Sequence, residues 1–487
     1  MNLVVLEPER PSENATRVQR NLLFSRAFQV GAGQVIRRCT RSLFFLLVAR
    51  RLAPGIFGVY VLLLAIVETL ALISGEGFTD YLTRELSKAP ELGRELYVKV
   101  IELRLLYAVL LFVPAILVLH SLKYPAEILA GASLLFLTLF PRAPFGAGQG
   151  VLRAAGRFGL LVWLETLQAL VLLVVGVSLL TKAPGLRGII WAEVASAFAG
   201  GLVAILMVHG LRQPKLKSAV TWRQVLRETS IFNVYPLITN IYDRVDVVLL
   251  SALAGSLAVG IYAVPYRALS AMQILPFAVF SALLPAIASI TADRNDKQLC
   301  SRMTGLFYSF ALFPVLGVTL LARPLILVLL GNGYAESTPV LRILIWAIIP
   351  MFVNYGLNTF LLARSHEKMF LRTTLVCAAV NIAANLILIP RFSYFAAAAV
   401  TILTEVVLLV QNVTIIRRIR GFFPVPDRFW QTSTVFLILL AGGLVGNAYA
   451  TSFWPAAAAF LLFAVYFYLT GYVRSVLTWT RNGAFAG

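Results

Sequence analysis

The stretch LLVARRLAPGIFGVYVLLLAIVETL, residues 46–70, is echoed later in the chain by LLSALAGSLAVGIYAVPYRALSAMQIL, residues 249–275. The triplet Gly58-Val59-Tyr60 aligns with Gly260-Ile261-Tyr262, about 202 residues further on, and each triplet follows one long apolar segment and opens another. Internal repeats in an apolar chain are typical of two-lobed membrane transporters, whose halves move around a site held between them. The echo therefore predicts two structurally related halves.

The composition places the protein in a membrane. Its 487 residues are 59% hydrophobic and 13% charged, against roughly 45–50% and 25% in soluble globular proteins. Apolar runs of about 18–25 residues recur from end to end, long enough to cross a hydrocarbon core of about 30 Å as helices. We predict an all-α, polytopic integral membrane protein with about 14 transmembrane helices. The predicted spans are 22–49, 57–76, 100–121, 126–148, 159–181, 187–210, 229–253, 258–290, 304–322, 339–362, 371–389, 395–416, 430–449 and 452–475.

Lysine and arginine are unevenly distributed between the predicted loops. With the N-terminus in the cytoplasm, the cytoplasmic loops and tails carry roughly 25 of them against roughly 7 on the other side, as the positive-inside rule requires. Both termini are then cytoplasmic. The loop 211–228 is the richest in basic residues and lies where the first half joins the second. Topology and contact with anionic lipid account for the net charge of +20, so no nucleic-acid partner is expected.

The first predicted span carries Arg37, Arg38 and Arg41 near its centre. A central arginine costs roughly 2.5–3.5 kcal/mol on insertion, so one side of this helix needs a polar environment. At about 100° per residue, Gln34 lies close to the arc of these arginines and extends a polar stripe along the helix. Such a stripe faces a water-filled cavity or buried partners. The alternatives are purely structural pairing inside the protein, or a later start that leaves the arginines at the interface.

The matching span of the second half carries Asp243, Arg244 and Asp246, and by the repeat offset Asp243 falls on Arg41. We expect acid and base to face one another across the cavity. In the next span Pro265, Pro276 and Pro285 are expected to bend the helix.

Two further carboxylates, Glu165 and Glu405, lie inside predicted spans. Each is a candidate for coupling transport to protons or sodium, because intramembrane carboxylates commonly mark ion pathways. The alternative for both is a place in an internal polar network.

Signatures of metal binding or catalysis do not appear in the sequence. The histidines His120, His209 and His366 lie far apart, and the three cysteines have no metal-ligand spacing. No nucleophile elbow or phosphate-binding glycine-rich loop is present. Membrane glycosyltransferases and ligases that act on lipid-linked sugars generally carry a large outer loop with acids or histidines, whereas the longest predicted outer loop, 323–338, is short and mostly apolar. We expect no metal, no cofactor and no enzymatic activity.

Three stretches carry a family resemblance. LVARRLAPGIFGVY (47–60) resembles the ARxLGxxxFGxY opening of the polysaccharide flippases, which belong to the multidrug/oligosaccharidyl-lipid/polysaccharide (MOP) superfamily. RPLILVLLGNGYAESTPVLRIL (323–344) resembles the outer segment of that family. NIAANLILIPRFSYFAAAAVTILTE (381–405) resembles its LNxxLIP and GAAxAT stretches. The order and spacing of the three stretches extend the resemblance over roughly residues 20–420.

The resemblance implies two six-helix lobes around a central cavity, followed by two C-terminal helices. We divide the chain into a cytoplasmic tail (1–21), an N-lobe (22–210), a basic linker (211–228), a C-lobe (229–416) and a C-terminal helix pair with its tail (417–487). The implied function is that of a flippase in the bacterial cytoplasmic (inner) membrane. It would translocate undecaprenyl-diphosphate-linked oligosaccharide by alternating access, for O-antigen, capsule or exopolysaccharide biosynthesis.

The implied site combines phosphate and sugar recognition. Arginine is the natural partner of phosphate oxygens, and Arg267 matches a region of the related lipid II flippases where a cavity arginine serves the diphosphate. The predicted diphosphate site therefore comprises Arg37, Arg38, Arg41 and Arg267, and the candidate sugar contacts are Asn240, Asn354 and Asn358. The expected partners are the lipid-linked substrate, membrane lipids, a polysaccharide polymerase and glycosyltransferases. We expect a monomer.

Other functions are weighed against this reading. A multidrug or organic-cation exporter of the same superfamily should have a cavity that favours acids over arginines. A membrane glycosyltransferase or polymerase should carry a catalytic pair on a long outer loop. A non-transporting membrane scaffold does not require buried charges, so the charges inside the predicted spans argue against this class.

Overall fold

The computed structural model describes residues 33, 36–121, 124–182, 185–211, 221–273, 276, 296–364, 368–449 and 454–471, and every regular element in these ranges is a helix. Ten of the described helices are long and apolar enough to cross a membrane. A helix over residues 36–51 comes first. It is followed by α2 (Pro54–Ile73), α3 (Glu76–Lys88), η1 (Pro90–Leu92), α4 (Gly93–Ser121), α5 (Ala126–Phe136), α6 (Leu139–Ala154), α7 (Phe158–Lys182), α8 (Leu186–Gly210), α9 (Trp222–Met272), α11 (Asp296–Leu330), η2 (Asn332–Tyr334), α12 (Ser337–Leu344), η3 (Ile345–Ala347), α13 (Ile348–Ala363), α14 (Lys368–Arg420), α15 (Phe429–Tyr449) and α16 (Trp454–Leu469).

The predicted all-α membrane fold is confirmed, because the described residues of each predicted span are mainly helical. Helices α9 and α14 each hold two predicted spans. A single residue with non-helical backbone angles separates them, Gly255 (φ 86°) in α9 and Ser393 (φ 50°) in α14. Glycine adopts a positive φ freely, whereas serine does so rarely. Each long element is therefore a pair of helices joined at one residue.

Several predicted boundaries are shifted, among them the start of α9 and the end of α11. Helix α9 begins at Trp222, seven residues earlier than predicted, because the Thr221 hydroxyl caps its first turn by accepting a hydrogen bond from the Gln224 amide at 3.3 Å. Helix α11 continues to Leu330, since apolar residues run on beyond its internal prolines. The predicted outer loop 323–338 was therefore wrong in extent, and only a short connection around η2 remains.

The bend expected at the prolines of the eighth predicted span stays a prediction. Pro265 lies inside α9 among residues with helical backbone angles, and the non-helical residue is Gly255. A glycine in the left-handed region reorients the chain without the steric cost that another residue would pay. Pro285 lies outside the described residues.

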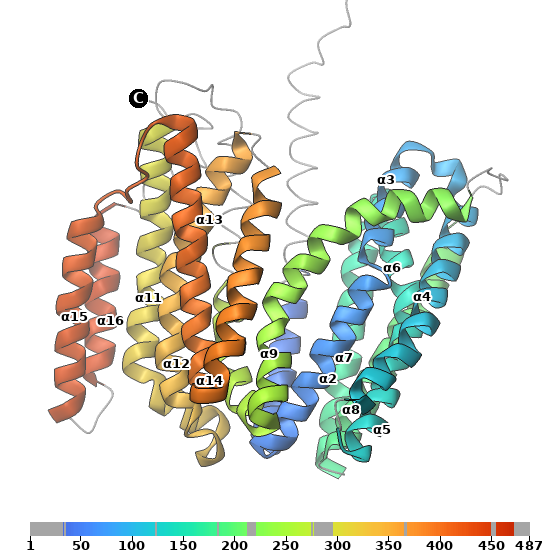
Figure 1. Cartoon of the computed structure of the whole chain (residues 1–487), viewed down its shortest axis with the longest axis horizontal. Coiled ribbons are helices and arrows are strands. Elements are labelled where there is room, and N and C mark those ends of the chain that lie inside the picture. The colour runs from blue at the N-terminus through green and yellow to red at the C-terminus, as the bar shows by residue number, and fades with distance from the viewer. Residues whose placement is uncertain are drawn as a thin grey trace, which may run out of the picture.

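The helices are arranged in two lobes and a peripheral pair (Figure 1). The N-lobe contains the helix over residues 36–51 together with α2 to α8, and the C-lobe contains α9 together with α11 to α14. Helices α15 and α16 lie on the outer side of the C-lobe and pack against α11. Aromatic rings build this contact: the Phe313 ring centroid lies 4.8 Å from that of Phe463 and 5.2 Å from that of Phe467.

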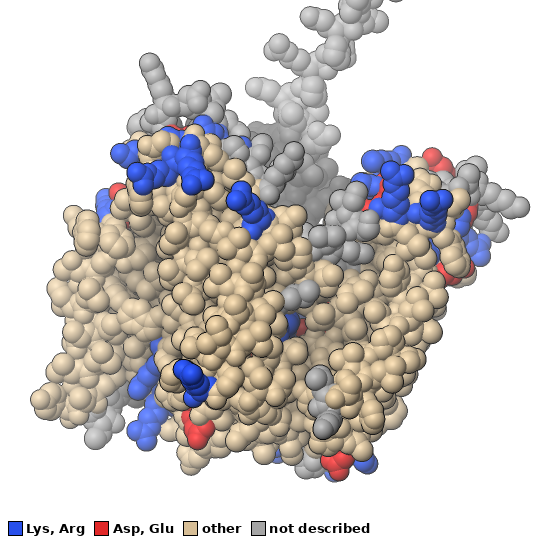
Figure 2. Space-filling view, viewed as in Figure 1, with Lys and Arg blue, Asp and Glu red and all other residues tan. Residues whose placement is uncertain are grey.

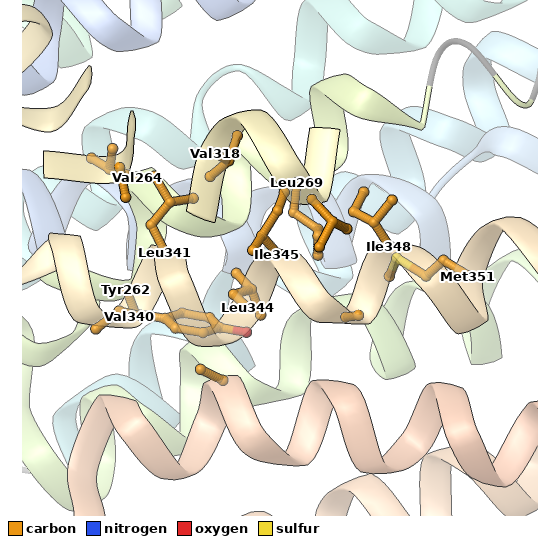
Figure 3. Packing of buried hydrophobic residues seen from close by; sticks show 14 of the residues in the cluster. Tyr262, Val264, Leu269, Val318, Val340, Leu341, Leu344, Ile345, Ile348 and Met351 are labelled. Atoms are coloured by element: carbon orange, nitrogen blue, oxygen red, sulfur yellow. The ribbon is translucent and has the colours of Figure 1, made fainter. Parts of the chain in front are cut away.

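The largest buried core lies in the C-lobe and extends into the contact between the lobes. Leu341, Leu344, Ile345 and Ile348 are fully buried or nearly so, and their spacing of three, four and seven residues places them on one helical face. Figure 3 shows these side chains among residues from α9 and α11, such as Leu269. The packed face fixes α12 against the helices that line the cavity described below.

The repeated triplets meet where the lobes cross. A Cβ added at Gly58 would lie 1.8 Å from the Ser256 carbonyl oxygen, and one added at Gly260 would lie 1.9 Å from the Pro54 carbonyl oxygen. The two helices therefore touch backbone to backbone, which only glycine permits. Nearby, the Tyr334 hydroxyl donates to the Leu52 carbonyl at 3.4 Å. The lobes are joined at the end that the charge distribution assigns to the outside.

Charged residues mark the two ends of the molecule. Figure 2 shows a broad band with few charges between them, and lysine and arginine gather mainly at the end where α3, the start of α9 and the end of α14 lie. Arg84, Lys88, Arg417 and Arg418 belong to these elements. The band is the face that lipid would cover, and the basic end is the predicted cytoplasmic end.

Candidate functional site

Two adjoining chambers lie between the lobes. The N-lobe chamber has a volume of about 530 Å³ and the C-lobe chamber about 450 Å³. Thr239, Asn240 and Asp243, all on the first helix of α9, line both of them. The chambers are therefore two parts of one central cavity, with α9 as the dividing wall.

The charged residues that line the two chambers are predominantly of opposite sign. The N-lobe chamber is lined by Arg37, Arg41, Arg104 and Arg142, with Glu68 and the shared Asp243 as its acids. The C-lobe chamber is lined by Asp243, Asp246 and Glu405, with Arg244 as its only described base. Each chamber thus favours ligand groups of the opposite sign.

The arginines of the first helix are held by buried carboxylates of the same lobe. Arg37 Nε lies 3.5 Å from Glu165 Oε2, and Arg41 Nη2 lies 3.9 Å from Glu193 Oε2. Both glutamates are only 6% exposed. Internal pairing was an alternative reading of this stripe, and the structure shows that it coexists with exposure to the cavity for both arginines.

Each of these carboxylates is also held by a neutral donor. Gln149 Nε2 donates to Glu165 at 2.7 Å, and the Tyr60 hydroxyl donates to Glu193 at 2.8 Å. Tyr60 belongs to the repeated triplet, and its counterpart Tyr262 donates in the same way to Asp246 at 2.6 Å. The tyrosines of both triplets thus donate to buried carboxylates, although the two carboxylates come from helices that are not counterparts in the repeat, α8 and α9.

An ion pair joins the lobes at the cavity. Arg244 Nη2 of α9 lies 2.5 Å from Glu68 Oε2 of α2. One residue along α2, the Thr69 hydroxyl donates to Asn240 Oδ1 at 2.9 Å. We expected acid and base to pair between the halves, with Asp243 matched to Arg41. The ion pair that forms uses Glu68 and Arg244, because these side chains extend from the faces of α2 and α9 that meet.

The C-lobe chamber contains a hydrogen-bonded polar network. Asn354 Nδ2 donates to Glu405 Oε2 at 3.1 Å, and the Tyr242 hydroxyl donates to Glu405 Oε1 at 3.4 Å. Asn354 in turn accepts a bond from Asn412 at 3.2 Å. Asn358 lines the same chamber. The structure therefore brings Asn240, Asn354, Asn358 and the three acids together.

Other predicted site residues lie elsewhere. Arg267 is placed over the Phe45 ring at 5.1 Å and lines a small adjoining pocket of about 30 Å³, which shares Arg41 and Glu68 with the N-lobe chamber. Arg38 is exposed and lines neither described chamber. Gln34 lies outside the described residues. The roles of these three in substrate binding stay predictions.

Three residues that line the cavity are not among the predicted site residues: Glu68, Arg104 and Arg142. Each lies inside a predicted span, so the signal that selected Arg37 and Arg41, a charge within an apolar run, applied to them as well. Isolated charges stood out less than the arginine cluster on the first span. Among the described residues, no group of three or more histidines, cysteines or carboxylates is arranged to hold a metal ion.

The fold and the cavity between its lobes define a two-lobed membrane transporter architecture. A family model described as polysaccharide biosynthesis protein matches residues 26–291, more than half of the chain. The chain therefore belongs to the polysaccharide biosynthesis protein family. A search of the curated proteins found no match.

Solved structures share the fold at low sequence identity. The lipid II flippase MurJ in an inward closed conformation is 14% identical, with a TM-score of 0.69 over 91% of this chain and 99% of that chain. A MATE family multidrug resistance transporter of the MOP superfamily, inward-facing, is 12% identical, with a TM-score of 0.61 over 83% and 95%. A MOP superfamily transporter from Pyrococcus furiosus, described as having a binding pocket of reverse polarity, is 13% identical, with a TM-score of 0.55 over 85% and 96%. This chain has the fold of MOP superfamily transporters.

Proposed function

We propose that this protein is a flippase that moves undecaprenyl-diphosphate-linked oligosaccharide across the bacterial cytoplasmic membrane by alternating access. The product would supply cell-surface polysaccharide synthesis, such as O-antigen, capsule or exopolysaccharide. The observation that carries the proposal is the charge division of the cavity, with four arginines lining the N-lobe chamber. Membership of the polysaccharide biosynthesis protein family supports the substrate class.

The chemistry of the substrate fits a cavity of this kind. A lipid-linked oligosaccharide has a charged head that cannot cross hydrocarbon and a tail that need not leave it. Arginines suit the diphosphate because their planar donors match phosphate oxygens. In this proposal Arg37 and Arg41 serve the diphosphate, and Glu165 and Glu193 hold them toward the chamber. Arg38 and Arg267 stay candidates at its margin.

The sugars would lie in the C-lobe chamber. Its amides and hydroxyls, among them Asn240, Asn354 and Asn358, offer the donors and acceptors that sugar hydroxyls require. The carboxylates Asp243, Asp246 and Glu405 are the candidates for coupling to an ion gradient, with Arg244 as the charge that balances them.

We propose that this conformation of the protein closes the cavity to the outside of the cell. The crossing at Gly58 and Gly260 and the Tyr334–Leu52 bond both support closure at the outer end. We propose that both termini lie in the cytoplasm, and the gathering of basic residues at one end supports this orientation. We propose that the protein acts as a monomer beside a polymerase and glycosyltransferases.

The test is genetic. Deletion of the gene should abolish the surface glycan and leave lipid-linked precursor in the membrane, and the intact gene should restore export. The triple variant Arg37→Ala, Arg41→Ala and Arg267→Ala should fail to restore it at a normal membrane level. Arg157→Ala, which removes an exposed arginine beyond the cavity, should restore it. Normal glycan in the deletion strain would refute the proposed function, and normal glycan in the triple variant would refute the assignment of the arginines.

One observation favours a second function, export of organic cations. Three carboxylates line the C-lobe chamber, and acids are what a cationic substrate requires. An exporter of this kind should protect the deletion strain against cationic dyes when expressed. A glycan defect without any change in dye sensitivity would exclude this alternative.

A further inference from the structure

We infer that the N-lobe chamber contains a preorganised diphosphate-binding site formed by Arg104 and Arg142, distinct from the arginine stripe of the first helix. The inference rests on the proposed function for the identity of the lipid, but the site itself follows from the geometry of the chamber. Its ligand class is a phosphate ester with adjacent phosphoryl groups.

Arg104 occupies a slot shaped by two glycines. The residue is 6% exposed, and its guanidinium nevertheless lines the N-lobe chamber. A Cβ added at Gly75 would lie 2.3 Å from Arg104 Nη2, and one added at Gly146 would lie 2.1 Å from Nη1. Any side chain at either position would displace the guanidinium, so both glycines are required for its placement.

The slot also fixes the guanidinium by hydrogen bonding. Arg104 Nη1 donates to the Thr79 hydroxyl at 3.1 Å, and that hydroxyl donates to the Gly146 carbonyl at 3.2 Å. A cation held in one orientation loses little conformational entropy when a ligand binds. Arginine in a fixed orientation also presents its donors as a planar fork, the arrangement that phosphoryl oxygens match.

Arg142 supplies the second cation. It lies four residues before Gly146 on α6, so both residues are on the same helical face, and that face touches Arg104. Arg142 lines the same chamber, together with the amides Gln149 and Gln168. Two arginines on neighbouring helices, α4 and α6, can therefore address two phosphoryl groups.

The position in the molecule suits a ligand arriving from the cytoplasmic leaflet. Arg104 lies eleven residues from the start of α4, which corresponds to about 16 Å along the helix from its cytoplasmic end. The Arg104–Arg142 site thus lies on the path of a headgroup that enters the chamber from this leaflet.

The experiment measures binding directly. Purified full-length protein in nanodiscs of neutral phosphatidylcholine is titrated with inorganic pyrophosphate and with farnesyl diphosphate by calorimetry. Arg104→Gln and Arg142→Gln should each weaken both ligands by about tenfold to hundredfold, the effect of losing a charge-assisted hydrogen bond. Arg157→Gln is the matched control for charge, and it should leave both dissociation constants unchanged.

A second variant tests the position of the Arg104 guanidinium separately from its charge. Gly146→Ala keeps every charge but pushes the guanidinium from its slot, so it should weaken binding as Arg104→Gln does. Gly159→Ala, at a helical glycine with open space around its Cβ position, is its control. Size-exclusion profiles and thermal unfolding of each variant verify that the protein is folded.

Three outcomes overturn the inference. In the first, Arg104→Gln and Arg142→Gln bind both ligands as the wild type does. In the second, Gly146→Ala binds normally. In the third, nanodiscs containing phosphatidylglycerol abolish diphosphate binding, which would make the site a headgroup site for ordinary anionic lipid. If the wild-type gene still restores glycan export in these cases, only this inference fails and the proposed function stands. A wild type that binds diphosphate but exports no glycan would leave the site intact and end the proposed function.

Discussion

Adding one methyl group at Gly58 should weaken closure of the outer end. In Gly58→Ala the new Cβ would lie 1.8 Å from the Ser256 carbonyl oxygen and 2.8 Å from the Gly260 amide nitrogen. Ordinary contact begins at 3.4 Å, so the two helices must separate by about 1.6 Å, because backbone atoms cannot rotate away. Overpacking of this kind costs about 1–3 kcal/mol. The equilibrium between closed and open outer ends should shift by about 5- to 150-fold.

The assay is labelling of the cavity from outside the cell. A reporter cysteine is introduced as Asn240→Cys, at a position that lines both chambers, after Cys39, Cys300 and Cys377 have been replaced by serine. Membrane-impermeant maleimide should react faster with this reporter when Gly58→Ala is present. The reciprocal variant Gly260→Ala should have a similar effect.

The control for this prediction lies one turn away on the same helix. A Cβ added at Gly55 would meet no atom within 4 Å, so Gly55→Ala should leave the labelling rate unchanged. Equal labelling rates in Gly58→Ala and Gly55→Ala would show that the lobes do not cross at the repeated glycines. The reasoning about the outer end would then be wrong.

Three further predictions concern particular contacts. Glu68→Gln should destabilise the closed protein by about 1.5–3 kcal/mol, the value of a charge-assisted hydrogen bond. A double-mutant cycle with Arg244→Gln, measured by thermal unfolding in detergent, should show strong coupling between the two residues. Independent effects of the two substitutions would disprove the ion pair between the lobes. Tyr60→Phe and Tyr262→Phe should each cost about 1.5–3 kcal/mol, since each hydroxyl donates to a buried carboxylate; denaturation midpoints that differ widely would argue against equivalent roles in the two halves. Ser393→Gly should raise the unfolding temperature by relieving about 1 kcal/mol of strain at φ 50°, and a lowered unfolding temperature would contradict it.

Much of the fold followed from the sequence because its controlling property is local. A segment such as 159–181 is long and apolar, and a membrane accepts it only as a helix, whatever its neighbours are. The repeated triplet also predicted related halves, and the structure places both of its glycines at the lobe crossing. The start of α9 was missed because the Thr221 cap extends the helix beyond the apolar run that the sequence reveals.

The sequence could predict that charged residues line a cavity, but not which of the charged residues do so. Arginines within an apolar span indicate a cavity or buried partners, and Arg37 and Arg41 have both. The same signal was present at Glu68, Arg104 and Arg142, although a charge in a span does not reveal which way its helix faces.

By itself the sequence determined a membrane-embedded helical protein with two related halves and charges inside its spans, because hydrophobic length and repetition are properties of the chain. Only the tertiary structure decided which charges meet. Glu193 is 152 positions from Arg41, and Arg244 is 176 from Glu68, so these pairs depend on which helix faces come together on packing. The division of the cavity into a basic and an acidic chamber has the same origin, since it arises only when the two lobes fold against one another.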